Sequence, residues 1–355
     1  MAAPSARLQT LVNSYLIPGA VDEVINHSPV TSRIIGNAKR WSGSQIERAV
    51  KYKTTGLGGT FTGLTEFATT DVATSIKLTY YLGAYEQPVV VPGIEKLINS
   101  ISEQTATSLV GYKTEESKIE MIDGLAQILF GNNNAEFNSL RDFADDGGQT
   151  ASIGNQSRTT YTALQGTDTA SGGTISLTKI RTLMTAVGSV STLGSRPTIG
   201  ICSETIWDLV ESLLTPTVQA NYQANGYPMV TSTSRAPVRN TELMGIQGYV
   251  SLVYAGVPIV ADERSTSQAF YLLNEDRLDW YGAKDPDLQS VDLGDASDLD
   301  SVYHRATPSK FHGFNWQPLM RPINQYGEVG HVFLFGQLIS WEPRRQGVLT
   351  GVTGV

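Results

Sequence analysis

Apolar and polar residues alternate most regularly between residues 74 and 82, where the pattern predicts a half-buried β-strand. Residues 45–52 carry a looser version of this pattern and are its predicted antiparallel partner. The connecting segment, residues 53–73, is rich in glycine and threonine, a composition that suits a flexible tip and not a core. Together the three segments predict a β-hairpin that projects as an arm.

A long amphipathic helix is predicted soon after this hairpin. Pro92 and Gly93 mark its start, Glu95 complements the dipole of its first turn, and Gly131 marks its end. Apolar residues recur at helical spacing between these limits, and the helix would be about 55 Å long at ~1.5 Å per residue. A break near Gly111 is the alternative, although one glycine costs only ~1 kcal/mol in a helix. We expect neither the hairpin nor this helix to bury its apolar side chains within one copy of the chain.

The rest of the chain predicts loops followed by a compact α/β unit. Residues 131–173 are dense in small polar residues and predict surface loops around one short helix at 138–144. The elements expected after them are helices at 176–187 and 203–214, buried strands at 198–202 and 257–261, a hairpin of 268–274 with 278–281, and an aromatic strand at 331–341. Residues 218–248 form a long polar insert.

The composition describes a folded chain without a membrane span or an internal disulfide. The 355 residues suffice for about two domains, 40% of them are hydrophobic, and the mean hydropathy is −0.13. No signal-peptide pattern opens the sequence, and the longest weakly polar run contains Pro258 and is too short to cross a bilayer. The single cysteine, Cys202, has apolar neighbours, which favours a buried small residue over a reactive thiol.

The charge is negative overall and unevenly distributed. A net charge of −8 argues against a protein that wraps nucleic acid with a basic surface. Residues 1–53 nevertheless hold seven Lys or Arg against three acidic residues, a surplus of +4 that leaves −12 for the remainder. This pattern is expected when the basic arm of one copy lies on the acidic body of another, although solvated surface charge also explains it.

Motif searches identify no catalytic or cofactor-binding residues. The glycines of residues 56–63 miss the spacing of a dinucleotide-binding loop and lie between two predicted strands. The four histidines have no zinc-ligand spacing, and no nucleophile elbow is present. The sequence therefore does not indicate an enzyme.

The most concentrated charge lies in residues 285–300, which hold six aspartates and no Lys or Arg. The spacing does not match a calcium-binding EF-hand loop. Weak metal-ligand candidates are Asp292, Asp295 and Asp298. A solvated acidic loop is favoured, and a cation-dependent enzyme using this segment is the alternative.

Several segments are weakly specific when each is taken alone, but their order along the chain is informative. The hairpin and the long helix are followed by Phe137–Gly147 and Ser157–Tyr161, and then by Pro197–Leu214 and Gly256–Asp262. Taken in this order, over most of the chain, these segments resemble the major capsid proteins of tailed phages, which have the Hong Kong 97-type shell fold.

The resemblance implies an α+β fold with five divisions. These are an N-arm at 1–38, an extended β-hairpin loop at 39–83, a peripheral domain at 84–175 with a spine helix at 93–130, an α/β axial domain at 176–275, and return strands at 276–355 that complete the peripheral domain.

The resemblance also implies a structural function. The expected protein is a coat protein of the virion, assembled in the host cytoplasm as hexamers and pentamers that close into an icosahedral shell around double-stranded DNA. Portal and decoration proteins are implied partners, and the short segment before the hairpin favours a separate scaffolding protein. An encapsulin-like cellular compartment is the alternative within the same fold.

Candidate contacts between subunits lie on the hairpin. They are Arg48, Lys51, Lys53, Gly58, Gly59, Phe61, Phe67 and Lys77. Some relatives form covalent crosslinks through a lysine of this loop, but no partner asparagine or catalytic carboxylate is identified here. Crosslinking is therefore not expected.

Overall fold

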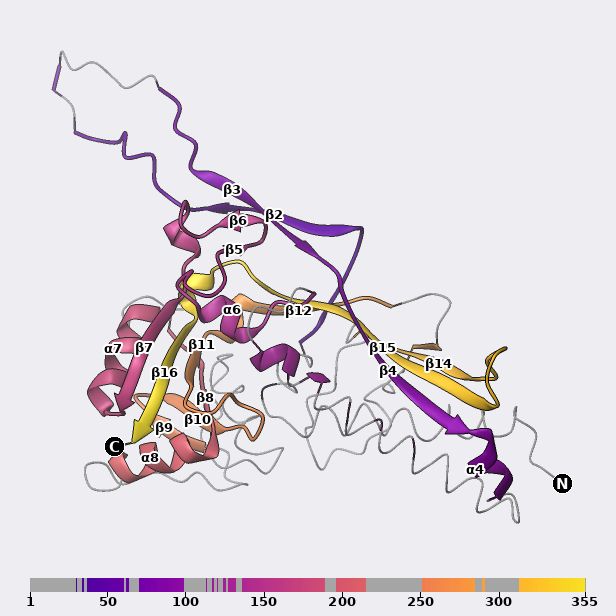
Figure 1. Cartoon of the computed structure of the whole chain (residues 1–355). Coiled ribbons are helices and arrows are strands. Elements are labelled where there is room, and N and C mark those ends of the chain that lie inside the picture. The colour runs from indigo at the N-terminus through magenta and orange to yellow at the C-terminus, as the bar shows by residue number, and fades with distance from the viewer. Residues whose placement is uncertain are drawn as a thin grey trace, which may run out of the picture.

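The computed structural model describes residues 37–60, 62–63, 70–98, 127–131, 136–188, 196–214, 251–284, 289–290 and 313–354, with single positions at 30, 34, 113, 117, 120, 124 and 125. These residues form two six-stranded sheets and two small two-stranded sheets. Figure 1 shows long strands running from the body of the molecule to a distant end, and a hairpin projecting on the other side.

The first sheet is organised around one long strand, β15 (Gly327–Ser340). One part of β15 pairs antiparallel with β4 (Gly83–Pro92), and the sheet order is β1-β12-β15-β14-β13. The other strands are β1 (Lys39–Arg40), β12 (Leu278–Gly282), β13 (Gln289–Ser290) and β14 (Phe314–Met320). The aromatic strand predicted at 331–341 is confirmed within β15, whereas β4 was missed because Pro88 interrupts its apolar pattern.

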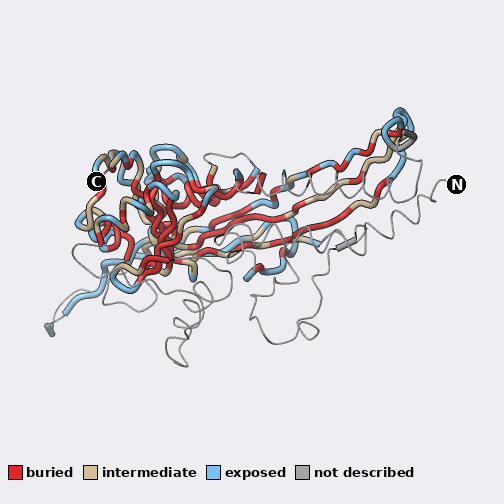
Figure 2. The backbone as a smooth tube through the Cα atoms, turned by 90° about the horizontal axis from the view of Figure 1, so that it is seen from below, coloured by how far each residue is buried: buried red, intermediate tan, exposed pale blue. Residues whose placement is uncertain are grey.

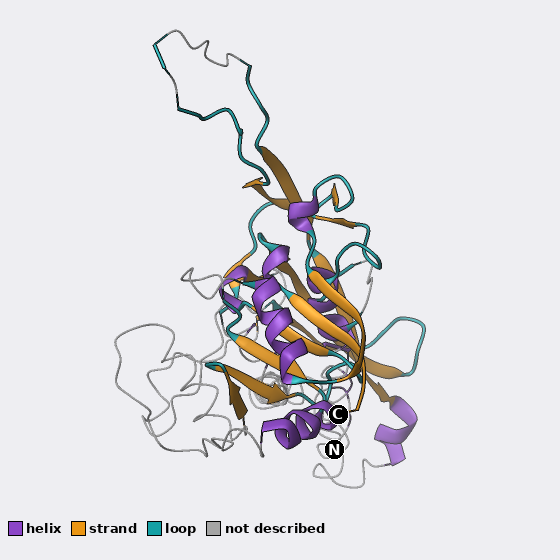
Figure 3. Ribbon diagram, turned by 90° about the vertical axis from the view of Figure 1, so that its left-hand side faces the viewer, coloured by secondary structure: helices purple, strands orange, loops and turns teal. Residues whose placement is uncertain are grey.

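The second sheet has the order β7-β16-β11-β8-β10-β9. Its strands are β7 (Thr167–Thr174), β8 (Ile199–Cys202), β9 (Ser251–Tyr254), β10 (Val257–Ala261), β11 (Phe270–Leu273) and β16 (Gly347–Gly354). Helices α7 (Leu177–Val187) and α8 (Glu204–Leu214) pack their apolar residues on one face (Figure 3). All residues of β8 and β11 are buried, which explains their continuous apolar runs.

Two predictions about this region are wrong. Strands β11 and β12 do not form a hairpin, because β11 pairs with β8 and β16 whereas β12 pairs with β15 and β1 in the other sheet. The 3₁₀ turn η3 (Glu275–Arg277) carries the chain from one sheet to the other. Residues 131–173 are not simply surface loops, since they include strand β7. The short helix predicted at 138–144 is confirmed as α6 (Leu140–Ala144), although it is buried.

Parts of the segment predicted as one long helix are described. Residues 93–98 form helix α4 (Gly93–Ile98), residues 127–130 are helical, and so are positions 113, 117, 120, 124 and 125, while the rest of 99–126 lies outside the described residues. The expectation that this helix cannot bury its apolar residues is wrong for its C-terminal part, where Leu125, Ile128 and Leu129 are buried. Gly111, the insert at 218–248 and the aspartates at 285, 287 and 292–300 lie outside the described residues.

Three aligned glycines allow aromatic rings to approach the first sheet. Gly83, Gly336 and Gly282 are cross-strand partners on β4, β15 and β12. A Cβ atom on Gly336 would lie 2.5 Å from Cζ2 of Trp280, whose ring stacks on Phe137 with centroids 6.4 Å apart. A Cβ atom on Gly83 would lie 2.8 Å from Cδ1 of Phe137, so Gly83 and Gly336 provide the space that this aromatic pair fills.

Replacing Gly336 with Val should destabilise the fold by overpacking. We expect the free energy of unfolding to fall by about 1–3 kcal/mol, measured by urea denaturation of the purified chain followed by tryptophan fluorescence. Gly58→Val is the matched control, because no atom lies within 4 Å of a Cβ placed there. Equal denaturation midpoints for the two variants would contradict this account of the glycine row.

Candidate functional site

The predicted hairpin is present and projects from the body of the molecule (Figure 1). Strand β2 (Gln45–Lys51) pairs antiparallel with β3 (Ser75–Tyr81), with Arg48 opposite Leu78. Residues 53–60 beyond the strands are exposed. Gly56 adopts a left-handed φ of +66°, and a Cβ atom on Gly58 or Gly59 would meet nothing within 4 Å. The tip therefore makes no close contact at these glycines.

The base of the hairpin is buried within its own chain, which corrects the expectation that it could not bury itself. Leu78 and Tyr80 are 0% and 2% exposed and belong to the main hydrophobic core. The Tyr80 hydroxyl donates a hydrogen bond to the Ser340 carbonyl at 2.7 Å, and its ring packs edge-on against Trp341. Burial raises the pKa of Tyr80, with the positive charge of Arg158 opposing the shift.

A short second hairpin supports this base from one side. It consists of β5 (Ser152–Ile153) and β6 (Gln156–Ser157), joined through Gly154. The Thr79 amide donates to the Gly154 carbonyl at 3.0 Å, and Gln156 Nε2 donates to the Lys77 carbonyl at 3.1 Å. Gly154 has a φ of +54°, and a Cβ atom there would lie 3.0 Å from Cβ of Leu78. Glycine is needed at this position for both conformation and space.

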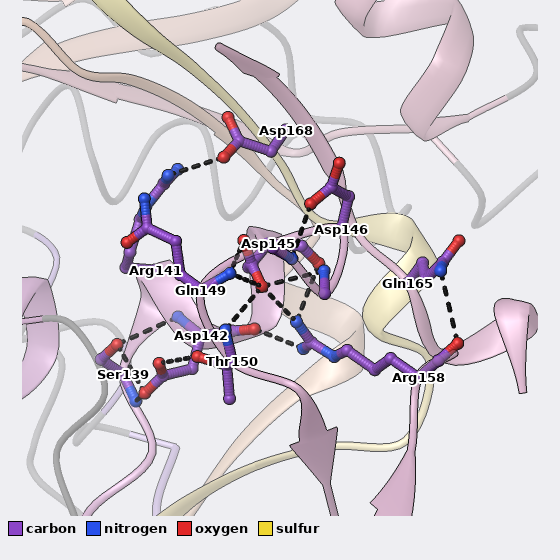
Figure 4. Close-up of polar contacts among 12 residues, drawn as sticks. Ser139, Arg141, Asp142, Asp145, Asp146, Gln149, Thr150, Arg158, Gln165 and Asp168 are labelled. Carbon is purple, nitrogen blue, oxygen red and sulfur yellow. Dashed lines mark hydrogen bonds and ion pairs between the residues drawn. The ribbon is translucent and has the colours of Figure 1, made fainter. Parts of the chain in front are cut away.

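The β5–β6 hairpin is in turn fixed by a buried ion pair between Arg158 and Asp145 (Figure 4). Both side chains are 0% exposed, and Arg158 Nη1 lies 3.2 Å from Asp145 Oδ2. Arg158 also donates to the Asp145 carbonyl at 2.9 Å and to the Asp142 carbonyl. Burial lowers the pKa of Arg158, and the charges of Asp145 and Asp142 oppose that shift.

The Asp145 carboxylate orders the backbone between α6 and β5. It accepts hydrogen bonds from the amides of Gly147 and Thr150, both at 2.9 Å, and from the amide of Gln149. A buried carboxylate needs hydrogen-bond partners of this kind. The loop that positions β5 is therefore built around one buried negative charge.

Helix α6 connects this loop to the second sheet. Ser139 caps the helix by accepting from the Asp142 amide at 3.0 Å, while Asp142 Oδ2 accepts from the Ser139 amide at 2.9 Å. Arg141 pairs with Asp168 of β7 at 2.6 Å, and both side chains are 8% exposed. The helix predicted at 138–144 is therefore confirmed, and the Ser-x-x-Asp pattern of a capping box marks its start.

The predicted contact residues of the hairpin have different environments. The Arg48 guanidinium lies 5.4 Å from the centre of the Trp341 ring, and Lys77 forms an ion pair with Glu47 at 2.7 Å. Lys51 and Lys53 are exposed, with Lys53 Nζ 5.3 Å from the centre of the Tyr52 ring. Phe61 and Phe67 lie outside the described residues. Arg48 and Lys77 thus already contact their own chain.

Other candidate sites are placed as follows. Cys202 is buried as predicted, and burial raises the pKa of its thiol. Among the described residues, no cluster of His, Cys, Asp or Glu could hold a metal ion, and the candidates Asp292, Asp295 and Asp298 lie outside that part of the chain. Within the same residues, no helix is long and apolar enough to cross a membrane.

Comparison with solved structures identifies the fold. The chain is similar to a subunit in the capsid asymmetric unit of cyanophage A-1(L), with a TM-score of 0.64 and 13% identity over 92% of this chain and 93% of that one. It is also similar to the SrpI encapsulin of Synechococcus elongatus PCC 7942, with a TM-score of 0.50 and 12% identity over 91% and 87% of the two chains. The capsid of an empty GTA particle gives a TM-score of 0.50 and 10% identity over 92% and 91%.

Comparison of the amino-acid sequence with known families and curated proteins finds no match. No protein-family model matches the chain, and no curated protein matches it. The structural similarity therefore establishes the Hong Kong 97-type shell fold, as the sequence predicted, over more than nine-tenths of the chain.

Replacing Arg158 with Met should strongly destabilise the base of the hairpin, because it leaves Asp145 buried without its cation. We expect the free energy of unfolding to fall by about 3–5 kcal/mol, measured by urea denaturation. Lys77→Met removes an exposed ion pair of the same hairpin and should cost at most ~1 kcal/mol. Equal effects of the two substitutions would show that the buried pair does not stabilise the fold.

Proposed function

We propose that this chain is the major capsid protein of a tailed virus, which assembles as hexamers and pentamers into an icosahedral shell enclosing double-stranded DNA. The observation that carries the proposal is the shell fold shared with the cyanophage capsid subunit over most of both chains. The function is structural: the chain works by contacting other copies and not by catalysis.

The hairpin is the proposed contact between neighbouring subunits. Its base is held rigidly by the core and the β5–β6 hairpin, whereas residues 53–60 extend away from the body with exposed side chains. A rigid base with an exposed tip can reach an adjacent copy without first folding onto its own body. Repeated in every subunit, such a contact stabilises a closed shell through multivalency.

Charge supports the same arrangement. The surplus of positive charge in residues 1–53 and the negative remainder favour a contact between the arm of one copy and the body of another. Arg48 and Lys77 contact the body or the strands of their own hairpin, whereas Lys51, Lys53, Gly58 and Gly59 are exposed toward or at the tip and are the proposed contact residues among those described. The negative charge of the body would also repel the phosphates of the enclosed DNA. We therefore propose that the shell encloses the DNA without sequence-specific binding.

The division of the chain follows from this proposal. We assign residues 1–38 to an N-arm, 39–83 to the extended loop, 84–175 to the peripheral domain, 176–275 to the axial domain, and 276–355 to return strands. The sheet of the axial domain additionally takes up β7 and β16 from the flanking divisions.

A virion coat protein assembled in the host cytoplasm would act with further proteins. A separate scaffolding protein, a portal and a decoration protein are the proposed partners. The rival proposal within this fold is an encapsulin-like compartment. The better structural agreement with the cyanophage subunit favours the virus, and a portal or terminase gene beside the coding gene would decide between the two.

Particle formation is the direct test of the proposed function. The chain, expressed alone and with its scaffolding protein, should form closed shells visible by negative-stain microscopy and by light scattering. A monodisperse species of 38.4 kDa under both conditions would contradict the proposal.

The glycines of the hairpin tip supply a second test. Replacing Gly58 and Gly59 with Val leaves the fold intact, since a Cβ atom meets nothing there, but restricts the backbone that must adapt to a neighbour. We expect a lower yield of closed shells with an unchanged unfolding midpoint of the chain. Normal shells from the double variant would contradict the role of these glycines.

A further inference from the structure

Two neighbouring segments carry the chain between the two sheets. The first contains η3, which joins β11 to β12, and the second contains η4 (Pro343–Arg345), which joins β15 to β16. The two segments are paired on both sides of these turns, since Leu272 is the partner of Gly347 and Leu278 is the partner of Ser340. One antiparallel pair of segments therefore leaves the first sheet and enters the second.

Two buried side-chain amides, defined here as the inter-sheet clasp, join these segments where they cross. The backbone amide of Asn274 donates to Gln346 Oε1 at 2.9 Å, and Gln346 Nε2 donates to the Asn274 carbonyl at 3.2 Å. Both residues are fully buried. Asn274 Nδ2 also donates to the Arg196 carbonyl at 3.0 Å, and the Thr167 amide donates to the Gln346 carbonyl at 3.1 Å. The clasp thus also holds the start of β7 and the segment that leads into β8.

Charged residues of the two turns are paired as well. Arg277 of η3 lies 3.2 Å from Glu342, and the same carboxylate lies 3.6 Å from Arg345 of η4. All three side chains are partly exposed, so solvent weakens these ion pairs. The buried amides are therefore the stronger directional link between the two turns.

The apolar core joins the sheets but does not by itself fix the angle between them. Trp280 and Leu338 of the first sheet share one core with Tyr271 and Val348 of the second. Figure 2 shows the buried residues concentrated in this body, from which the long strands of the first sheet extend. Apolar burial is non-directional, whereas hydrogen bonds weaken steeply when their angle changes and leave costly unpaired groups when they break. The clasp therefore selects one angle among those that keep the core buried.

We propose that the inter-sheet clasp fixes the angle between the two sheets and, through that angle, the curvature of the shell. This inference rests on the proposed function, because curvature is a property of the assembled particle. The hairpin is carried on the side of the first sheet, where Tyr80 bonds to Ser340 of β15. A different angle would tilt the hairpin relative to the second sheet in every subunit, and symmetry would repeat that tilt around the shell.

Spin-label distances test the clasp on the free chain. Cys202 is buried, so nitroxide labels can be placed selectively at Ala84→Cys on β4 and Ala186→Cys on α7, two exposed positions that belong to different sheets or their covering helix. The doubly labelled chain, diluted with unlabelled chain, should give one narrow distance distribution by pulsed electron paramagnetic resonance. Adding Gln346→Met removes both side-chain hydrogen bonds to Asn274 and should broaden this distribution.

Gln337→Met is the matched control. Gln337 is a buried amide of β15 whose Nε2 donates to the carbonyls of Tyr81 and Glu136, both at 3.0 Å. These bonds link β15 to the base of the hairpin and to the segment before α6, not to the second sheet. The two substitutions should lower the urea midpoint similarly, but Gln337→Met should leave the distances narrow. Equal broadening by both would overturn the clasp, and so would an unchanged distribution in the Gln346→Met chain.

Shell diameter tests the link to curvature. With its scaffolding protein, the unsubstituted chain should form shells of one diameter by negative-stain microscopy. Gln346→Met should lose this single diameter and give shells of several sizes together with open sheets. A single diameter from that variant would overturn the link to curvature, as would mixed diameters from the unsubstituted chain. Absence of shells from the unsubstituted chain would contradict the proposed function, while the spin-label distances would still decide whether the clasp fixes the angle.

A second variant keeps the test decisive if Gln346→Met does not fold. Gln346→Asn retains a buried amide, but its side chain is one methylene too short to reach both backbone atoms of Asn274. We expect this variant to broaden the distance distribution and to lose the single shell diameter in the same way. An unchanged distribution would overturn the clasp.

Discussion

The buried ion pair between Arg158 and Asp145 is the interaction on which the arrangement of the hairpin depends. Neither side chain reaches solvent, so each charge must be balanced by the other and by hydrogen bonds from the backbone. The Asp145 carboxylate accepts hydrogen bonds from backbone amides of residues 147–150, and the Arg158 guanidinium donates hydrogen bonds to backbone carbonyls of α6 and its C-cap. These bonds fix the turn that leads into β5, and β5–β6 supports Leu78 and Tyr80.

The base and the tip of the hairpin therefore differ in how closely they pack against the rest of the chain. Its base is part of the main core, whereas its tip lies outside the body with glycines that have no close neighbours. A stiff base conserves the direction in which the tip points, and an unconstrained tip can fit surfaces that differ slightly. Both properties suit the contact between copies that we propose for the hairpin.

Strand β15 links the base of the hairpin to the far end of the first sheet. Its last residue, Ser340, accepts the hydrogen bond of Tyr80 at the base of the hairpin, and its first residue, Gly327, follows the turn after β14. A strand from Gly327 to Ser340 spans about 45 Å at ~3.3 Å per residue. Pairing with β4, β12 and β14 stiffens it, so the far end of the sheet is held at a defined distance from the base of the hairpin.

Local patterns determined the elements that depend on neighbouring residues. Periodicity correctly predicted the strand at 74–82, the helices at 176–187 and 203–214, and the buried strands β8 and β10. It was sufficient because an element that is buried on one or both faces carries apolar residues at regular or continuous positions in the sequence. The order of these elements also predicted the shell fold. The composition of residues 131–173 correctly allowed a short helix but wrongly predicted surface loops around it, since buried polar residues that bond to one another have the same composition as surface loops.

Only the tertiary structure decided which strands pair and where the exposed apolar residues meet. Periodicity could not place β11 and β12 in different sheets, nor bring Arg158 to Asp145, because both depend on contacts between distant residues. For the same reason the sequence did not distinguish Val90, Ile94, Met320, Ile323 and Tyr326 from buried apolar residues, and only the fold shows that they are exposed. The sequence determined which segments form strands and helices, and packing between distant residues determined which of these elements pair and share a core.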